Sequence, residues 1–253
     1  MSNSPIVTAP QLADLGPLRL LYVPTAEERP AGMAVVPIHD WIATAKQSDT
    51  GFDDVAYWQD QIGQLGLTQD ALTVVLDNGG MTEAARVWFI LQYFGLPAAV
   101  LNGGLPELRT LPTQATPGTS APDLRPGAWA VGLIGRQELK VALQSVQIFD
   151  ARTAAEFKGE DLKGNKRQGH LPGAAHIDHR DLLDGRHLRP ASELAQMLAD
   201  AEVRSGAPVV THCQGGGRAA LAALAAVAAG QEDVRVYYLS FGDWAADESC
   251  PLE

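Results

Sequence analysis

The chain has 253 residues, of which 46% are hydrophobic, so it can form one large domain or two ordinary domains with buried cores. Its 19 basic and 30 acidic side chains give a formal charge of −11, which argues against nucleic acid or an anionic membrane as the main partner. No signal peptide or membrane-spanning apolar run is apparent, and two cysteines make no disulfide framework. We therefore expect a cytoplasmic protein without nucleic-acid or membrane partners.

The chain falls into two halves separated by a segment rich in proline, threonine, serine and glycine. This segment, residues 111–127, contains four prolines, a composition that resists packing and is typical of a linker. We predict a first domain at residues 1–110 and a second at residues 128–253, each close to the usual domain size.

The two halves resemble each other in sequence. Residues 73–85 align without a gap with residues 208–220, and Gly95 then falls opposite Gly230, where each helix is expected to end. A duplicated fold is the simplest explanation. In this alignment Asn78 stands opposite Cys213.

Short apolar strands alternate with helical periodicity in the second half. The predicted strands are residues 147–150, 175–177, 208–212 and 234–239, and the predicted helices are residues 136–143, 191–203 and 217–229. This alternation predicts an α/β fold in which each half has a mostly parallel central sheet flanked by helices. Active sites in such sheets lie beyond the carboxyl ends of the strands, which is where Cys213 stands.

The segment after the 208–212 strand carries the clearest chemical signal. Cys213 and Gln214 precede three glycines, which allow successive backbone amides to turn inward around one point. Arg218 then begins an alanine-rich helix, whose positive dipole end faces the same place. A thiol in that setting ionises readily and is a candidate nucleophile. The alternative is a small buried cysteine beside a flexible turn. Cys250, near the end of the chain, is predicted to be an incidental tail residue.

Two further segments support the loop. Asp150 and Arg152 follow the 147–150 strand, so the guanidinium can reach the same sheet edge and bind an oxyanion; the alternative is a surface network with Glu156. His170 lies in a turn, where it either contacts substrate or anchors the turn.

Together these segments resemble the rhodanese family, the thiosulfate sulfurtransferases, in its tandem two-domain form. The matching motifs are Asp150-Ala-Arg with Glu156-Phe, Gly169-His-Leu-Pro-Gly-Ala, the Cys213 loop, Gly242-Asp-Trp and, in the first half, Ala84-Ala-Arg-Val-Trp and Leu101-Asn-Gly-Gly-Leu. The resemblance implies two rhodanese-like domains of which only the second is catalytic. The first half agrees, because Asn78 cannot form a persulfide and Val23 and Thr25 stand opposite Asp150 and Arg152.

The resemblance also implies a reaction. Cys213 takes a sulfane sulfur from thiosulfate as a persulfide and passes it to a thiophilic acceptor, either cyanide or a thiol. Arg152, Arg218, Gln214 and the glycines Gly215, Gly216 and Gly217 would bind the small anionic donor, with Asp150 and His170 in support. No metal or other cofactor is expected, and the protein is expected to be a monomer or weak oligomer.

The donor and the reaction class have alternatives. Gln214 and Gly215 match neither the thiosulfate-type nor the mercaptopyruvate-type loop, so mercaptopyruvate or a low-molecular-weight persulfide remains an alternative donor. The alternative reaction class is that of a cysteine phosphatase or arsenate reductase. Its loop places five residues between cysteine and arginine, whereas four separate Cys213 from Arg218, a length that favours the sulfurtransferase. The last alternative is a non-catalytic binding module.

Overall fold

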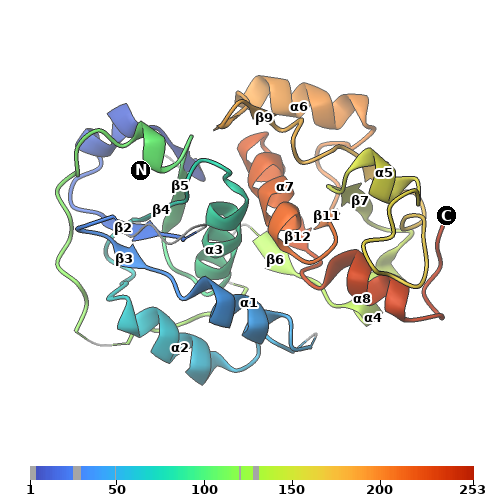
Figure 1. The fold of residues 1–253 in the computed structure, drawn as a ribbon, viewed down its shortest axis with the longest axis horizontal. Coiled ribbons are helices and arrows are strands. Elements are labelled where there is room, and N and C mark those ends of the chain that lie inside the picture. The colour runs from blue at the N-terminus through green and yellow to red at the C-terminus, as the bar shows by residue number, and fades with distance from the viewer. Residues whose placement is uncertain (1–3, 25–29, 49, 120, 128–130) are drawn as a thin grey trace. The chain divides into compact units, whose positions relative to one another are not determined.

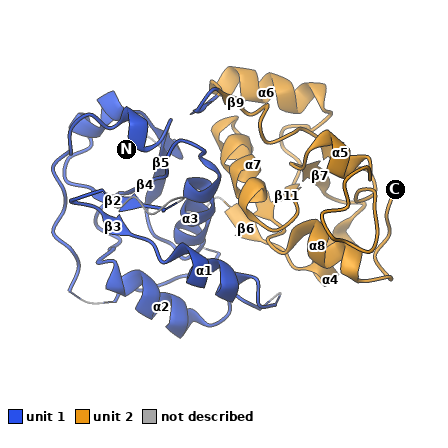
Figure 2. Cartoon of the chain, in the orientation of Figure 1, with its two compact units in different colours: residues 1–129, 185–188 blue, residues 130–184, 189–253 orange. Residues whose placement is uncertain are grey.

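The computed structural model describes residues 4–24, 30–48, 50–119, 121–127 and 131–253. The chain divides into two compact units, residues 1–129 with 185–188 and residues 130–184 with 189–253 (Figure 2). Each unit contains a five-stranded parallel sheet with helices against it, which confirms the predicted α/β class and the repeated halves. The predicted start of the second domain, residue 128, lies outside the described residues.

Unit 1 contains the sheet of order β1-β5-β4-β2-β3. Its strands are β1 (Ile6–Val7), β2 (Arg19–Tyr22), β3 (Ala34–Val35), β4 (Thr73–Leu76) and β5 (Ala98–Leu101), and its α-helices are α1 (Ile38–Ala45), α2 (Val55–Gln64) and α3 (Thr82–Tyr93). Two 3-10 helices, η1 (Ala9–Asp14) and η2 (Leu105–Glu107), complete it.

Unit 2 repeats the same topology with the order β6-β12-β11-β7-β8. The strands are β6 (Val131–Leu133), β7 (Gln147–Asp150), β8 (Ala175–His176), β11 (Val209–His212) and β12 (Val234–Val236), and the helices are α4 (Arg136–Ala142), α5 (Ala154–Phe157), α6 (Ala191–Asp200), α7 (Gly217–Ala228) and α8 (Ser240–Ala246). A short pair, β9 (Leu183–Asp184) with β10 (His187–Leu188), stands apart from this sheet. All four strands and three helices predicted for this half are therefore confirmed, with shorter ends for several.

The central strand β11 is buried along its whole length, as expected for a parallel strand covered on both faces. Helix α7 packs against β11 and β12, and α6 lies beside α7 (Figure 1). The alanines of α7 allow this close approach because they add little bulk. Cys250 is only 1% exposed and belongs to a core cluster with Trp244 and Phe241, so it is a core residue rather than an incidental tail residue.

Strand register corrects the alignment of the two halves by one residue. Leu76 pairs with Tyr22 as His212 pairs with Asp150, so the residue after each central strand is Asp77 in unit 1 and Cys213 in unit 2. The loop from β4 to α3 is one residue longer than the loop from β11 to α7, which the gapless alignment could not accommodate. Asp77, not Asn78, therefore stands at the position of Cys213.

The same register moves the counterparts of the motif that contains Asp150. Tyr22, not Val23, stands at the position of Asp150. Thr25, the expected counterpart of Arg152, lies outside the described residues.

The proline-rich segment 111–127 packs on unit 1 where it is described. Leu18 N donates to Thr113 O at 3.2 Å, Arg125 N donates to Phe94 O at 2.9 Å, and Gly127 N donates to Tyr93 O at 2.8 Å. These bonds give the segment a defined path along unit 1.

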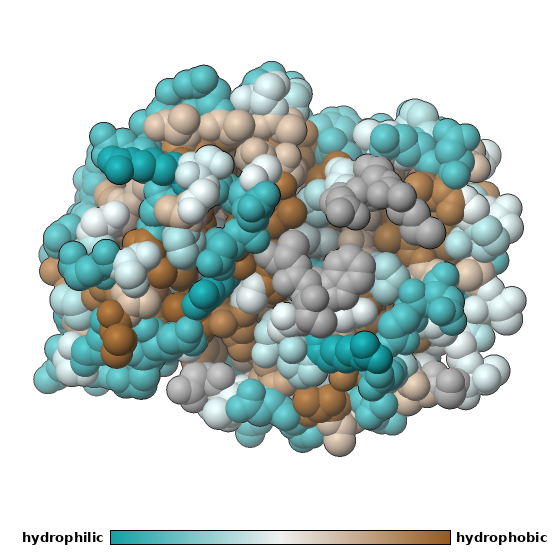
Figure 3. Space-filling model, turned by 180° about the vertical axis from the view of Figure 1, so that it is seen from behind, coloured by the Kyte–Doolittle hydropathy of each residue, from teal (hydrophilic) through white to brown (hydrophobic). Residues whose placement is uncertain are grey.

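The surface carries few large exposed hydrophobic side chains among the described residues. They are Leu15, Leu111, Val141 and Leu162. Most of the face in Figure 3 is hydrophilic or neutral, with hydrophobic residues scattered among them. Every helix in the described part of the chain is too short or too polar to cross a bilayer.

Candidate active site

The loop after β11 surrounds the sulfur of Cys213, which is 1% exposed. The Gly215 and Gly216 amides donate to Sγ at 3.4 and 3.2 Å, and the Ser240 hydroxyl lies 3.8 Å from it. Gly216 has φ +99°, and a Cβ there would lie 2.9 Å from the Tyr238 carbonyl oxygen, so this position requires glycine. Two backbone amides thus converge on one sulfur beside the Ser240 hydroxyl, an arrangement suited to an anionic sulfur.

The start of α8 fixes the loop from the opposite side. Cys213 N donates to Ser240 Oγ at 3.1 Å, and Phe241 N donates to Cys213 O at 2.9 Å. Ser240 is fully buried, has φ +63°, and donates its hydroxyl to Tyr237 O at 2.8 Å. The orientation of the hydroxyl beside the sulfur is therefore set by the backbone of the turn.

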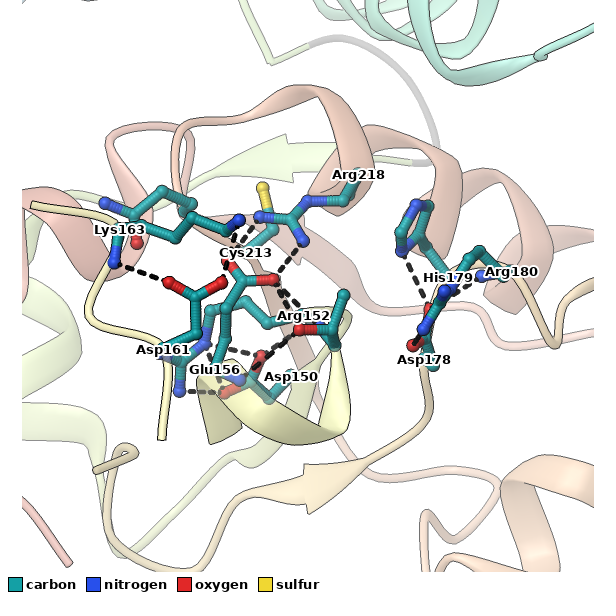
Figure 4. A network of polar contacts seen from close by, with 12 residues as sticks. Asp150, Arg152, Glu156, Asp161, Lys163, Asp178, His179, Arg180, Cys213 and Arg218 are labelled. Carbon is teal, nitrogen blue, oxygen red and sulfur yellow. Dashed lines mark hydrogen bonds and ion pairs between the residues drawn. The ribbon is translucent and has the colours of Figure 1, made fainter. Parts of the chain in front are cut away.

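Arg218 lies one residue inside α7 and forms a two-pronged ion pair with Glu156 of α5 (Figure 4). Its Nη1 and Nη2 donate to the two carboxylate oxygens at 2.6 and 2.8 Å. Burial alone would raise the pKa of Glu156, but hydrogen bonds from Arg218 and Thr153 lower it to about 2. The guanidinium is oriented by this pair, and the Arg218 side chain remains 19% exposed. It can therefore also meet a ligand.

Asp150 and Arg152 form a buried group beneath the loop. Arg152 Nη2 donates to Asp150 Oδ2 at 2.6 Å and to Gly169 O at 3.0 Å, and its guanidinium lies 3.8 Å from the Phe241 ring centre. Both side chains are at most 1% exposed. The contacts of Arg152 favour support of the sheet edge, and its binding of the donor stays a prediction.

His212 faces this group from β11. Its Nε2 lies 3.4 Å from Asp150 Oδ2, and the side chain is fully buried. Burial lowers the pKa of His212, so the imidazole is neutral at neutral pH. Burial alone would raise the pKa of Asp150, but the hydrogen-bonded and charged Arg152 lowers it. Arg152 is the permanently charged partner that keeps this carboxylate ionised.

The remaining predicted residues occupy the periphery. His170 Nδ1 lies 3.1 Å from Phe157 O, its ring stacks on Phe157, and its backbone exchanges two hydrogen bonds with Glu253, contacts that anchor the turn. The Gln214 side chain pairs with Asn165. Gly217 is the first residue of α7.

Several residues near the loop were not found from the sequence. Lys163 and His179 belong to segments without a motif, and Ser240 stands two residues before the Gly242-Asp-Trp motif. Only the folded chain brings these three side chains to this sheet edge. Figure 4 shows Lys163 and His179 on the same side of the loop as Arg218. Burial and the charge of Arg218 both lower the pKa of His179, although Asp178 lies 3.0 Å away. The one available signal for Ser240 was its place beside the Gly242-Asp-Trp motif.

The corresponding loop of unit 1 is occupied by a carboxylate. Asp77 Oδ1 accepts hydrogen bonds from Gly79 N at 2.8 Å and Met81 N at 3.0 Å, and Oδ2 accepts one from Ala84 N at 3.1 Å. Asp77 is 1% exposed. The protein's own carboxylate thus fills the place that the sulfur has in unit 2. No group of three or more metal-binding side chains suited to hold an ion occurs among the described residues of either unit.

Comparison with known proteins gives a consistent family. The Rhodanese-like domain family matches residues 135–247. Thiosulfate sulfurtransferase of Azotobacter vinelandii is 33% identical over 203 residues, which cover 76% of this chain and 73% of the relative. The 3-mercaptopyruvate sulfurtransferase of Escherichia coli K12 is 28% identical over 200 residues, covering 75% of this chain and 70% of the relative.

Solved structures agree on the fold. SseA from Escherichia coli, described as a 3-mercaptopyruvate sulfotransferase, matches with a TM-score of 0.71 at 22% identity, covering 94% of this chain and 99% of SseA. EanB in complex with ergothioneine matches with a TM-score of 0.77 at 18% identity, and this chain spans 64% of EanB. With two rhodanese-like folds and relatives at about 30% identity that are named sulfurtransferases, the chain belongs to the rhodanese family.

Proposed function

We propose that the protein transfers a sulfane sulfur from thiosulfate to a thiophilic acceptor, cyanide or a thiol, through a persulfide on Cys213. The observation that carries the proposal is the convergence of the Gly215 and Gly216 amides on the buried Cys213 sulfur. The relatives named thiosulfate sulfurtransferase support this choice of donor.

Transfer takes place in two displacements. The Cys213 thiolate attacks the outer sulfur of thiosulfate, the sulfur–sulfur bond of the donor breaks, and sulfite leaves with the electron pair. The acceptor then attacks the outer sulfur of the persulfide, and the Cys213 thiolate is released. Because one half-reaction is complete before the other begins, the kinetics are of the ping-pong type.

The loop stabilises the same charge at each stage. The sulfur anion is present as thiolate before the first displacement and as persulfide after it, and backbone amides can donate to both. Arg218 binds the anionic end of the donor, since its guanidinium is oriented by Glu156 and its side chain is partly exposed.

The two units have different roles in this proposal. Residues 128–253 form the catalytic domain and residues 1–110 a non-catalytic one, because Asp77 stands where unit 2 has Cys213. A carboxylate cannot accept a sulfane sulfur as a persulfide.

Mercaptopyruvate is the second candidate donor, because one similar relative is a 3-mercaptopyruvate sulfurtransferase. Steady-state kinetics with thiosulfate and mercaptopyruvate, using Cys213→Ser as the blank, distinguish the two. We expect the higher kcat/KM with thiosulfate. A preference for mercaptopyruvate would overturn the choice of donor but not the sulfur transfer.

The persulfide itself is tested by mass spectrometry after exposure to thiosulfate without acceptor. We expect the mass of one added sulfur atom on the peptide that contains Cys213 and none in Cys213→Ser. An active enzyme without this adduct would refute the mechanism. Hydrolysis of an aryl phosphate, lost in Cys213→Ser, would instead favour a phosphatase.

A further inference from the structure

We propose that Asn165 and Gln214 form a positioning clasp that holds the turn of residues 161–165 against the catalytic loop and thereby strengthens binding of the anionic donor. The inference rests on the proposed sulfur transfer for its effect on the donor, but the clasp can be tested without turnover. Neither side chain acts on the reacting sulfur in this proposal.

The clasp consists of two reciprocal hydrogen bonds between side-chain amides. Asn165 Nδ2 donates to Gln214 Oε1 at 3.0 Å, and Gln214 Nε2 donates to Asn165 Oδ1 at 2.9 Å. Each side-chain amide therefore donates one hydrogen bond to the other amide and accepts one from it. Such a pair fixes the relative orientation of both planes and joins two segments that are distant in sequence.

The Gln214 side of the clasp is rigid. The backbone carbonyl oxygen of Gln214 accepts a hydrogen bond from Gly242 N at 3.3 Å. A Cβ on Gly242 would lie 3.0 Å from that backbone oxygen and 3.3 Å from Gln214 Nε2. The start of α8 thus leaves room for Gln214 only because residue 242 is glycine. With its amide engaged by Asn165, Gln214 acts as an anchor and not as a free ligand for substrate.

The Asn165 side of the clasp ends a charged turn. Asn165 Nδ2 also donates to Leu162 O at 2.7 Å, which closes the turn. Lys163 has φ +47°, donates its backbone amide to Asp161 Oδ1 at 3.1 Å, and places its ammonium 2.8 Å from Asp161 Oδ2. These contacts define the conformation of the turn, and the clasp fixes the position of the turn relative to the catalytic loop.

The turn lies close to the Glu156–Arg218 pair beside the catalytic loop. Figure 4 shows Lys163 extending toward Arg218 on the side of the loop that holds Cys213. Hydrogen bonding to Asp161 raises the pKa of Lys163, and the charges of Glu156 and Arg218 also act on it. Asp161 offsets the charge of Lys163, so the position of the turn matters through how near the ammonium end of this pair stands to an approaching anion. An exposed charge acts strongly only at short range.

The test compares Asn165→Ala, Gln214→Ala and the double variant. We expect each single variant to raise KM for thiosulfate about fivefold, the equivalent of about 1 kcal/mol, with kcat within about twofold of wild type. The double variant should match the single variants, because either substitution opens the same clasp. Gln196→Ala is the matched control, since it removes another glutamine side-chain hydrogen bond, to Asp200, on α6.

A second measurement tests, without turnover, how strongly the surroundings of Cys213 attract an anion. Iodoacetate and iodoacetamide alkylate the same thiol and differ in that only the first is anionic. We expect the rate with iodoacetate divided by the rate with iodoacetamide to fall several-fold in Asn165→Ala and Gln214→Ala. The same quotient should stay constant in Gln196→Ala. A rate with iodoacetamide close to that of wild type shows that the loop is intact.

An unchanged quotient of the iodoacetate and iodoacetamide rates in both single variants would overturn the proposed role of the clasp. A double variant whose change in KM is the product of the two single changes would overturn it as well. An unchanged KM with a lowered ratio would overturn its role in donor binding. A wild-type protein that is alkylated at Cys213 but transfers no sulfur would refute the proposed function, while the ratio would still decide the clasp.

Discussion

Arg152 and Asp150 have a close counterpart elsewhere in unit 2, and the difference between the two pairs is burial. Arg180 donates its backbone amide and its guanidinium to Asp178, as Arg152 does to Asp150. The Arg152 side chain is 1% exposed, whereas that of Arg180 is 68% exposed. Removal of Arg152 leaves the Asp150 carboxylate uncompensated in the core, whereas removal of the exposed Arg180 guanidinium lets water reach Asp178, whose side chain is 8% exposed.

We therefore expect Arg152→Met to lower the free energy of unfolding by about 3–5 kcal/mol and Arg180→Met to lower it by about 1 kcal/mol or less. Urea denaturation at neutral pH measures both. Equal losses would contradict the structural role of Arg152. A stable Arg152→Met with a raised KM for thiosulfate would support the predicted contact with the donor instead.

Glu156 provides a pH-dependent contribution to stability. Its pKa is about 2 in the folded chain, below its ordinary value of 4.5. The folded state thus binds protons less readily than the unfolded state, so this contribution is fully present above about pH 5 and is lost as pH falls toward 2. We expect the difference in urea midpoint between wild type and Glu156→Gln to be constant from pH 7 to 5 and to shrink below 4.5. The control is Glu193→Gln, at an exposed pair with Arg189. A difference independent of pH would refute the ion pair.

At the residue scale, the sequence could propose Cys213, Arg218 and Asp150 as candidate site residues because they belong to short motifs next to strands. It could not identify Ser240 or Lys163, because no local pattern marks a side chain that reaches the site through tertiary packing. Glu156 was considered only as a partner of Arg152. The direction in which Arg218 leaves α7 decided its actual partner.

The loop between β11 and α7 depends on backbone path more than on side chains. Gly216 and Gly230, at the two ends of α7, have φ +99° and +95°. A Cβ at residue 216 would lie 2.9 Å from the Tyr238 carbonyl oxygen, whereas a Cβ at residue 230 would meet nothing within 4 Å. Both glycines therefore have a positive φ, but only at residue 216 would an added Cβ also collide with a neighbouring atom.

We expect Gly216→Ala to displace the amide that donates to Cys213 and to lower kcat/KM at least about tenfold. Gly230→Ala should cost about 1 kcal/mol of stability and leave activity near that of wild type. Activity assays and thermal unfolding of both variants provide the comparison. Equal activities would show that the position of the Gly216 amide is not important for catalysis.

At the element scale, the sequence predicted the longer and more periodic elements of unit 2. It missed β6, β9, β10, α5 and α8 in the second half of the chain, which have two to seven residues and give little periodicity. The one-residue error in aligning the halves has a similar origin, because only hydrogen-bond register shows that the β4–α3 loop is longer.

The two units use one architecture with opposite charge at the loop. Unit 1 has the Asp77 carboxylate in its loop, and Glu83 stands on α3 where unit 2 has Arg218 on α7. Glu83 is paired with Arg86 at 2.7 Å. An anionic donor would therefore meet a carboxylate in unit 1 where unit 2 presents a guanidinium.

We expect Asp77→Cys in a Cys213→Ser background to give a thiol that iodoacetamide labels, but transfer from thiosulfate at least about a hundredfold slower than in wild type. Asn78→Cys in the wild-type background should leave turnover unchanged, because residue 78 lies one position beyond the equivalent of Cys213. Labelling followed by peptide mass mapping, together with the activity assay, checks both. Rapid turnover by Asp77→Cys would show that the cation on α7 is not needed.

Backbone amides supply two of the contacts to the Cys213 sulfur, and every residue type except proline carries such an amide. These groups belong to the main chain, so a side-chain replacement removes them only where it displaces the chain path, as it would at Gly216. Inheritance of the chain path, more than of any set of polar side chains, therefore preserves the donors to this sulfur.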